Sequence, residues 1–263
     1  MDIIYGIHAV EEALKAGGRA FDHIAVARER HDNKVLRLID LCKASGIPVR
    51  FVPRDHLDRI TKNESHQGIA AVAAGKAYSD VDAILDHKKS KFLFVLVLDG
   101  IEDPHNLGAL IRSADGAGVD GIVIPERRAA GVNATVVKSS AGASEYARIA
   151  RVTNIARTLD ELKAQNVWVV GLDERGRQTY DELDFNIDCA LVLGAEGSGL
   201  HDLVRKKCDH LVRLPMEGKV ASLNVSVAGG VVMYEVARQR RLGSGSPPPA
   251  LPKKAKSGKG LGS

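Results

Sequence analysis

The stretch FLFVLVLDGIEDPHNLGALIRSADGAG, residues 92–118, is an apolar run that ends in a polar loop and then enters a segment of small residues. The same order of apolar run, polar loop and small residues recurs in CALVLGAEGSGL, residues 189–200, and in LVRLPMEGKVASLNVSVAGGVV, residues 211–232. Each polar loop would follow a strand, and parallel α/β sheets bind ligands at the carboxyl ends of their strands. The three stretches therefore predict an α/β fold with a ligand site at one edge of a parallel sheet.

The remainder of the C-terminal half repeats this alternation of strand-like and helix-like segments. Apolar runs at 121–125 and 167–173 alternate with helix-like stretches at 153–166 and 200–209. Runs that are apolar on both faces and separated by helices are typical of a parallel sheet that is covered on both sides. We expect residues 91–242 to form one α/β domain of this kind.

A second, smaller α/β domain is predicted over residues 1–76, where short β-like runs alternate with helical ones. One helix is predicted over 34–46, where apolar residues recur at i, i+3, i+4 and i+7. Residues 77–90 are polar and are expected to link the two domains. The tail, 243–263, is rich in Pro, Gly, Ser and Lys, and we expect it to be disordered.

The excess of positive charge comes from the tail. Of the 37 Lys and Arg residues, four lie in the tail, which has no acidic residue, so the rest of the chain has 33 basic and 33 acidic residues. A neutral total does not exclude RNA as a partner, because RNA binding requires a clustered basic face rather than a basic total.

Three widely spaced cysteines without a CxxC pair indicate neither a disulfide framework nor a zinc site. The nine histidines show no HExxH or paired spacing, so no metal is expected. The N-terminus lacks the pattern of a secretory leader, and no run approaches the ~18 apolar residues of a membrane span. We expect a reduced, cytoplasmic protein that does not associate with membranes.

Asn106 and Arg112 are the candidate site residues of the first stretch. Asn106 suits a helix N-cap, because its side-chain oxygen can accept a backbone N–H of the first turn. Arg112 lies one turn after Gly108 on the same predicted helix face, which would admit a phosphate or a ribose beside the guanidinium. Taken alone, a capping Asn and a solvated helix Arg are the commoner roles.

Glu196, Ser222 and Asn224 are the candidates of the second and third stretches. Glu196 lies in the segment 194–199, whose glycines permit positive φ and a close approach of a ligand to the backbone. No GK[ST] follows it, and the chain has no GxGxxG fingerprint at a strand-to-helix turn, which disfavours an ordinary nucleotide-binding enzyme. A plain turn and a capped core helix are the ordinary alternatives. The small residues at 228–230 are poor helix formers, so their helix must pack closely against another helix or a second subunit.

Together the three stretches resemble the signature motifs of the SpoU family of RNA ribose 2′-O-methyltransferases, the TrmH-like branch of the SPOUT superfamily. The elements N…LGA…R, LGAEGSG and SLNVSVA occur in the family's order and with its separation. The resemblance implies a trefoil knot in the C-terminal domain, S-adenosyl-L-methionine as the cofactor, RNA as the substrate and a homodimeric assembly.

The same resemblance implies roles for individual residues. It implies catalytic and ribose-positioning roles for Asn106, Arg112, Glu196, Ser222 and Asn224, and cofactor contacts at Gly194, Leu214 and Leu223. Within this set, Glu196 would contribute on the RNA side. A guanidinium does not give up its proton in proteins, which disfavours Arg112 as a general base, so we expect it to bind a phosphate and to stabilise the developing alkoxide. The identity of the base is left open.

The N-terminal segment, from IYGIHAVEEAL to HQGIAAV, resembles the ribosomal-protein-L30-like RNA-binding domain of bacterial 23S rRNA guanosine 2′-O-methyltransferases. This likeness implies that the target is a guanosine of 23S rRNA near the peptidyl-transferase centre. Two alternatives are open: a methyltransferase for another rRNA or tRNA nucleotide, and, from another class, a non-catalytic RNA-binding protein.

Overall fold

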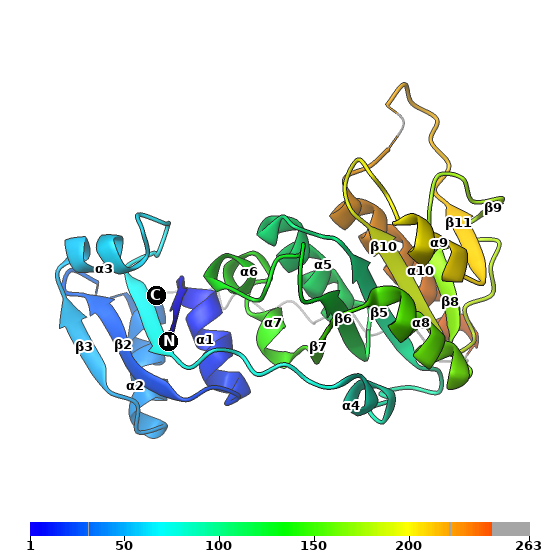
Figure 1. Ribbon diagram of the computed structural model, residues 1–263. Helices are drawn as coiled ribbons and strands as arrows, with labels where there is room; N and C mark the ends of the chain where they lie inside the picture. Colours follow the sequence, from blue (N-terminus) through cyan, green and yellow to red (C-terminus); the bar gives the residue numbers. More distant parts are fainter. Residues whose placement is uncertain (31, 221, 244–263) are drawn as a thin grey trace, which may run out of the picture.

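The computed structural model describes residues 1–30, 32–220 and 222–243, which form two α/β parts joined by an extended segment (Figure 1). Gly243 is the last residue of the C-terminal helix, and the remainder of the expected disordered tail, 244–263, lies outside the described residues.

The N-terminal part is a four-stranded sheet with helices on both faces. Its elements are β1 (Asp2–Tyr5), α1 (Ile7–Ala16), β2 (Phe21–Ala27), α2 (Asn33–Ala44), β3 (Val49–Val52), α3 (Arg54–Ile60) and β4 (Ile69–Ala73). The strand order is β1-β4-β2-β3, and only β2 and β3 run parallel. Helices α1 and α2 pack on one face and α3 on the other. Helix α2 forms where the sequence predicts it, because all four of its periodic apolar residues are buried and Asp32 caps its N-terminus.

The segment 77–90, predicted to be a polar linker, contains a short helix, α4 (Val81–Leu85), that is packed onto the C-terminal part. Ile84 of α4 is fully buried, and it lies so close to Gly121 that a Cβ there would overlap it. Ser79 forms a β-bridge with Ala150 in the same part. Because Ile84 is the one buried residue of α4, the segment has no repeating apolar pattern of the kind that predicts a helix.

The C-terminal part is built on a seven-stranded sheet in which every strand pair is parallel, as the apolar runs predict. Its elements are β5 (Phe94–Asp99), α5 (Pro104–Gly116), β6 (Gly121–Pro125), α6 (Ala134–Ser139), α7 (Ala143–Tyr146), β7 (Ile149–Val152), α8 (Ile155–Ala164), β8 (Trp168–Leu172), β9 (Gln178–Thr179), β10 (Cys189–Gly194), α9 (Asp202–Lys207), β11 (His210–Arg213) and α10 (Val225–Gly243).

Helices cover both faces of this sheet. In β5, the side chains at 94, 96 and 98 join a core that includes residues of α5, α6 and α10. The intervening Val95 and Val97 join a second core with α4, α8 and α9. Burial on both faces explains why the strands read as continuous apolar runs instead of alternating with polar residues.

The strand order β7-β6-β5-β10-β8-β11-β9 places a topological switch point in the middle of the sheet. From β5 the chain proceeds outward through β6 and β7, then crosses to β8, and β10 later fills the place between β5 and β8. The loops after β5 and β10 therefore leave the same sheet edge in diverging directions, which opens a crevice where open α/β sheets bind ligands. The parallel-sheet α/β class predicted from the sequence is confirmed, while the trefoil knot stays a prediction.

The two parts are joined by a buried interface between α1 and β1 on one side and α6 and α7 on the other (Figure 1). Arg19 donates from Nε and Nη2 to the two carboxylate oxygens of Glu145 in α7, at 2.8 and 2.9 Å. The side chains of this pair are only 1% and 2% exposed. The hydrophobic core also runs continuously across the interface.

None of the helices within the described ranges has the length and apolar character needed to cross a membrane.

Candidate active site

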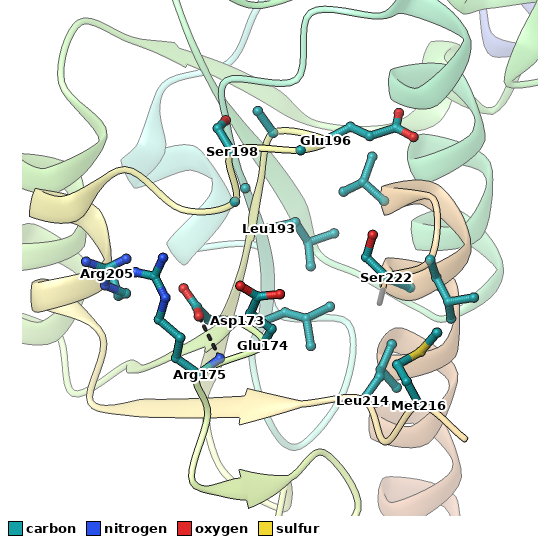
Figure 2. A pocket seen from close by; sticks show the side chains of 18 residues that line it. Asp173, Glu174, Arg175, Leu193, Glu196, Ser198, Arg205, Leu214, Met216 and Ser222 are labelled. Atoms are coloured by element: carbon teal, nitrogen blue, oxygen red, sulfur yellow. Dashed lines mark hydrogen bonds between the residues drawn. The ribbon is translucent and has the colours of Figure 1, made fainter. Parts of the chain in front are cut away.

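A cavity of about 250 Å³ opens at the carboxyl ends of β8, β10 and β11, beside the switch point. It is lined by Leu172, Asp173, Glu174, Arg175, Leu193, Gly194, Ala195, Glu196, Gly197, Ser198, Gly199, Arg205, Leu214, Met216, Ser222, Leu223, Val225 and Ala228. We call it the first cavity. Figure 2 shows Arg175 and Arg205 on one side of it, Ser222 and Met216 on the other, and Glu196 at one end. Five of the eight residues proposed from the sequence therefore share one cavity.

The glycines of the segment 194–199 shape one wall of the first cavity. Gly194 ends β10, and a Cβ there would overlap the backbone of Gly199 and Leu200. The backbones of Ala195 and Gly199 exchange two hydrogen bonds, of 3.1 and 2.9 Å, which fold the loop back on itself. Gly197 and Gly199 have φ of +83° and +67°, values that favour glycine. The close approach predicted for these glycines is thus an approach of the loop to its own backbone.

Asn106, Glu196 and Asn224, one from each sequence stretch, meet in a hydrogen-bonded set. Asn106 Nδ2 donates to Glu196 Oε2 at 3.1 Å, and Asn224 Nδ2 donates to Asn106 Oδ1 at 3.0 Å. A longer contact of 3.5 Å joins Asn224 Nδ2 to Glu196 Oε2. Glu196 Oε1 has no hydrogen-bond partner within the described part of the chain. The set therefore fixes one oxygen of the carboxylate and leaves the other available to a ligand.

Asn106 is not the N-cap that the sequence suggested. Helix α5 begins one residue after Asp103, whose carboxylate accepts from the backbone N–H groups of His105 and Asn106. Pro104 at the first helical position fits this start, because proline has no N–H to satisfy there. With the cap supplied by Asp103, the Asn106 side chain is free to bind Glu196 instead.

The third stretch supplies both a cavity wall and a helix cap. Ser222, Leu214 and Leu223 line the first cavity, where Leu214 follows β11. Asn224 precedes α10, and its Oδ1 accepts from the backbone N–H of Ser226 at 2.9 Å. The capping role and the contact with Asn106 use different atoms of one amide, so Asn224 caps α10 and holds Asn106 at the same time.

The close packing predicted for residues 228–230 occurs within the chain. A Cβ at Gly229 would overlap the side chains of Leu193 in β10 and Leu110 in α5. Gly230 faces α5 as well, with Ser113 Oγ at 3.7 Å from an added Cβ. Gly229 therefore brings α10 down onto its own sheet and is not available as a contact for a second subunit.

Arg112 lies outside the first cavity and outside the hydrogen-bonded set. It is exposed on α5 and forms no ion pair or hydrogen bond with any described residue. The open face expected beside it is absent, because a Cβ at Gly108 would overlap Ser139 of α6. One turn beyond Arg112, a Cβ at Gly116 would approach the Tyr234 hydroxyl of α10 to 2.5 Å. Arg112 is therefore at the outer edge of the contact between α5 and α10.

A second cavity, of about 310 Å³, lies on the other side of the loop that carries Glu196. It is lined by Gly100, Ile101, Glu102, Asp103, Asn106, Arg128, Ala195, Glu196, Ser198, His201 and Val225. Ala195, Glu196, Ser198 and Val225 line both cavities. The Glu196 loop is therefore a wall between two adjoining spaces, and the hydrogen-bonded set stands at their boundary.

Sequence reasoning missed the side of the first cavity formed by the end of β8. Asp173, Glu174 and Arg175 follow this strand, and the carboxylate of Asp173 accepts from the backbone N–H of Arg175 at 2.9 Å (Figure 2). The strand itself is predicted over 167–173, so the polar residues at its end could have been recognised as candidate site residues. In a parallel sheet, that end had to lie on the same edge as Gly194.

The residues of the first cavity suit S-adenosylmethionine. Leu193, Leu214 and Leu223 present an apolar wall for a flat base, and Asp173 and Ser198 offer polar groups. Such a mixture of an apolar wall with a few polar groups is what nucleoside-sized ligands require. The fit of the chain to this cofactor therefore depends mainly on backbone shape and apolar packing.

Residues 93–234 match the model of the SpoU rRNA Methylase family, and residues 3–79 match the model described as RNA 2′-O ribose methyltransferase substrate binding. The Bacillus subtilis protein YacO, whose name places it provisionally in the TrmH family of tRNA/rRNA methyltransferases, is 45% identical over 241 residues, or 91% of this chain and 96% of its own. The 23S rRNA (guanosine-2′-O-)-methyltransferase RlmB of Pectobacterium atrosepticum is 43% identical over 242 residues, or 91% of this chain and 98% of its own.

Solved structures show the same architecture. The SpoU methyltransferase AviRb from Streptomyces viridochromogenes, crystallised in complex with AdoMet, superposes with a TM-score of 0.78 at 28% identity. The superposition covers 90% of this chain and 89% of AviRb, so it includes both parts of the fold.

Proposed function

The chain belongs to the SpoU rRNA methylase family, and we propose that it transfers a methyl group from S-adenosylmethionine to the 2′-hydroxyl of a ribose in RNA. The observation that carries this proposal is the hydrogen-bonded set of Asn106, Glu196 and Asn224 at the boundary of two cavities. A methyl donor in the first cavity and a ribose in the second would meet at this set.

We assign the cofactor to the first cavity, with Gly194, Leu214 and Leu223 among its contacts. When bound, S-adenosylmethionine supplies an electrophilic methyl group on a sulfonium centre. The AdoMet complex of AviRb, which shares the fold, supports this assignment. Ser222 lines the same cavity and is placed to hold a polar group of the cofactor or of the ribose.

The chain's own part in the reaction is mainly to orient the hydroxyl and to guide its proton. Asn106 and Asn224 hold Glu196 Oε2, which directs the free Oε1 toward a ribose hydroxyl as a hydrogen-bond acceptor. Holding two reactants in a productive geometry is worth several kcal/mol of the barrier, about 7–11 in favourable cases. Attack of the ribose oxygen on the methyl carbon would break the bond from that carbon to sulfur and release S-adenosylhomocysteine. The hydroxyl proton would pass to water or to a phosphate, and an Arg112 guanidinium supplied by the partner subunit, as argued below, would stabilise negative charge on the oxygen as the proton leaves.

We propose a guanosine of 23S rRNA as the target, and the cytoplasm as the compartment. The support is the RlmB relative at 43% identity and the match of residues 3–79 to a substrate-binding model. The test is to incubate the protein with labelled S-adenosylmethionine and either protein-free 23S rRNA or tRNA, and then to map 2′-O-methyl groups. Methylation of tRNA alone would replace the rRNA target, and no methylation of either would favour the non-catalytic alternative.

Two variants of Asn224 make this experiment specific to the site. Asn224→Asp keeps an oxygen to cap α10 but removes the amide donor to Asn106, whereas Asn224→Ala removes both. We expect methyl transfer to fall by roughly a hundredfold or more in both, the scale of losing a preorganised contact, while only the Ala variant loses helix stability. Near-normal transfer by Asn224→Asp would remove the hydrogen-bonded set from the mechanism.

We further propose that the protein is a homodimer that uses an exposed apolar stripe of α10. Val227, Val231 and Tyr234 follow one another at i, i+4 and i+7 and are 52%, 39% and 55% exposed. An apolar stripe of this kind on a helix is typical of a helix-to-helix contact. Val231→Glu should produce a monomer in analytical ultracentrifugation, and a wild-type protein that sediments as an active monomer would contradict the proposal.

The same assembly would explain the position of Arg112. Arg112 lines neither cavity of its own chain, and it lies one helical turn before Gly116, the residue of α5 that Tyr234 of the proposed dimer face approaches. We therefore propose that Arg112 serves the site of the partner subunit. Its phosphate-binding role then operates between subunits, which would make activity depend on the dimer.

A further inference from the structure

The second cavity has one cationic side chain among its lining residues, Arg128, which lies with the carboxylates of Glu102, Asp103 and Glu196. We propose that this cavity receives the target nucleotide and that Arg128 binds the phosphate next to the methylated ribose. This inference rests on the proposed function, because it names where the RNA substrate of that site is held. It assigns a binding role to a residue outside the three sequence motifs.

The guanidinium of Arg128 has no partner within the described ranges, although acidic groups line the same cavity. Arg128 is exposed and forms no salt bridge or hydrogen bond to another described residue. A nearby arginine behaves differently, since Arg151 Nη2 donates to the carbonyl of Glu126 at 2.9 Å. Arg128 therefore keeps all its donors free, as a group that binds a phosphate with two parallel hydrogen bonds requires.

The backbone of Arg128 is held in a conformation that a side chain rarely adopts. Its φ is +55°, in the left-handed region where glycine would be less strained. The loop is fixed on both sides of Arg128, because Glu126 N donates to Val152 O at 2.9 Å before it and Ala130 N donates to Ile101 O at 2.8 Å after it. Strained residues held by an ordered surrounding are concentrated at functional sites. Five other described non-glycine residues also have positive φ, so this conformation supports the proposal only together with the place of Arg128 in the second cavity.

The charges of the cavity define how a nucleotide would lie in it. Carboxylates accept hydrogen bonds from sugar hydroxyls and base N–H groups but repel a phosphate, so the phosphate belongs at Arg128. Asn106 and Glu196 line the same cavity and form the hydrogen-bonded set. In RNA the 2′-hydroxyl is adjacent to the 3′-phosphate, so one nucleotide can place its hydroxyl at Glu196 while Arg128 binds its backbone.

The test compares Arg128 with the preceding residue, Arg127, which has the same charge and exposure but does not line the cavity. RNA affinity is measured by titrating labelled 23S rRNA fragments with Arg128→Ala and Arg127→Ala in the presence of S-adenosylhomocysteine. We expect Arg128→Ala to weaken binding by roughly tenfold or more, the loss of one charge-assisted bidentate contact, and Arg127→Ala by about twofold. Equal losses in the two variants would show general electrostatic attraction and would overturn the proposal.

Two further measurements separate binding from folding and from chemistry. Arg128→Gly should lose RNA affinity to the same extent while its Tm stays equal to or above that of the wild type, because glycine relieves the positive φ. With saturating RNA, kcat of Arg128→Ala should stay within about threefold of wild type and KM for RNA should rise by roughly tenfold. A kcat loss without a KM change would contradict a binding role. Because affinity is measured without turnover, a wild-type protein that binds RNA but transfers no methyl group would refute the proposed function alone.

Discussion

Replacing Arg19 by Met tests whether the buried ion pair with Glu145 holds the substrate-binding and methyltransferase parts together. Arg19 binds both oxygens of Glu145 at 2.8 and 2.9 Å, and its Nη1 donates to Asp2 at 2.9 Å and to the carbonyl of Ala74 at 3.1 Å. With side chains 1% and 2% exposed, neither charge of the central pair can be solvated in the folded protein. Removal of Arg19 would therefore leave the Glu145 carboxylate buried without the partner that binds both its oxygens, with Lys76, whose Nζ donates to the Glu145 backbone carbonyl, as a nearby cation.

The expected cost of Arg19→Met is about 3–5 kcal/mol in the free energy of unfolding, the range for breaking one side of a buried pair. In a protein of this size, that corresponds to a fall in Tm of about 10 °C. The double variant Arg19→Met/Glu145→Leu should recover most of the loss, because it removes both charges of the buried pair. The stability of Glu145→Gln should lie between those of the single and the double variant, because Arg19 keeps its bond to Asp2.

The assay is urea and thermal unfolding followed by circular dichroism, with Arg157→Met as the matched control. Arg157 pairs with Glu161 at 3.4 Å, but the two side chains are 69% and 55% exposed, so the same substitution should cost less than about 1 kcal/mol. An Arg19→Met shift no larger than the control, or a double variant as unstable as the single one, would refute the reasoning. A stable protein with weaker RNA binding would instead show that the pair only sets the orientation of the two parts.

Three further outcomes are expected. S-adenosylmethionine at ~100 times its dissociation constant should add ~2.7 kcal/mol of stability and raise Tm by several degrees, and no shift with either it or its demethylated product would remove the cofactor assignment. When inactive Arg112→Ala and Asn224→Ala dimers are mixed and exchange subunits, half of the dimers become mixed. If Arg112 acts across the symmetric interface, each mixed dimer has one intact site, and about a quarter of wild-type activity should return. If Arg112 acts within one chain, no activity should return. Burial raises the pKa of Cys42 to about 11 and those of Cys189 and Cys208 to about 12, so these thiols should stay unreactive toward a thiol reagent at pH 8 until the protein unfolds; rapid labelling of the native protein would contradict the structure.

Sequence patterns predicted the sheet because its strands are buried on both faces. Runs such as 121–125 and 189–194 agree with β6 and β10 residue for residue, since a strand covered on two sides must be apolar throughout. The polar strand ends then place Gly194 and Glu196 at one edge without further information. The cavity itself follows from the strand order, which local periodicity does not contain.

The positions of Asn106 and Arg112 depended on neighbours that no pattern specifies. Two residues near the start of α5 could cap it, and Asp103 does so because a proline follows it. The glycine beside Arg112 indicated an open face, but the same lack of a side chain admits Ser139 of another helix. A glycine in a sequence shows that something approaches closely, and only the fold shows whether the approaching group is a ligand or the protein itself.

The Glu196 loop explains why the three motifs have to occur together. Its glycines fold it tightly enough to be a thin wall, so a group in either cavity can reach the carboxylate. That carboxylate is oriented by Asn106 from α5 and Asn224 from α10, and these helices pack against each other through Gly229 and its neighbours. A change in the packing of α10 would move Asn224 relative to the wall and would misplace the hydroxyl acceptor. We therefore expect the small residues of α10 to affect catalysis through the geometry of the wall, and Ala228 among them also lines the first cavity.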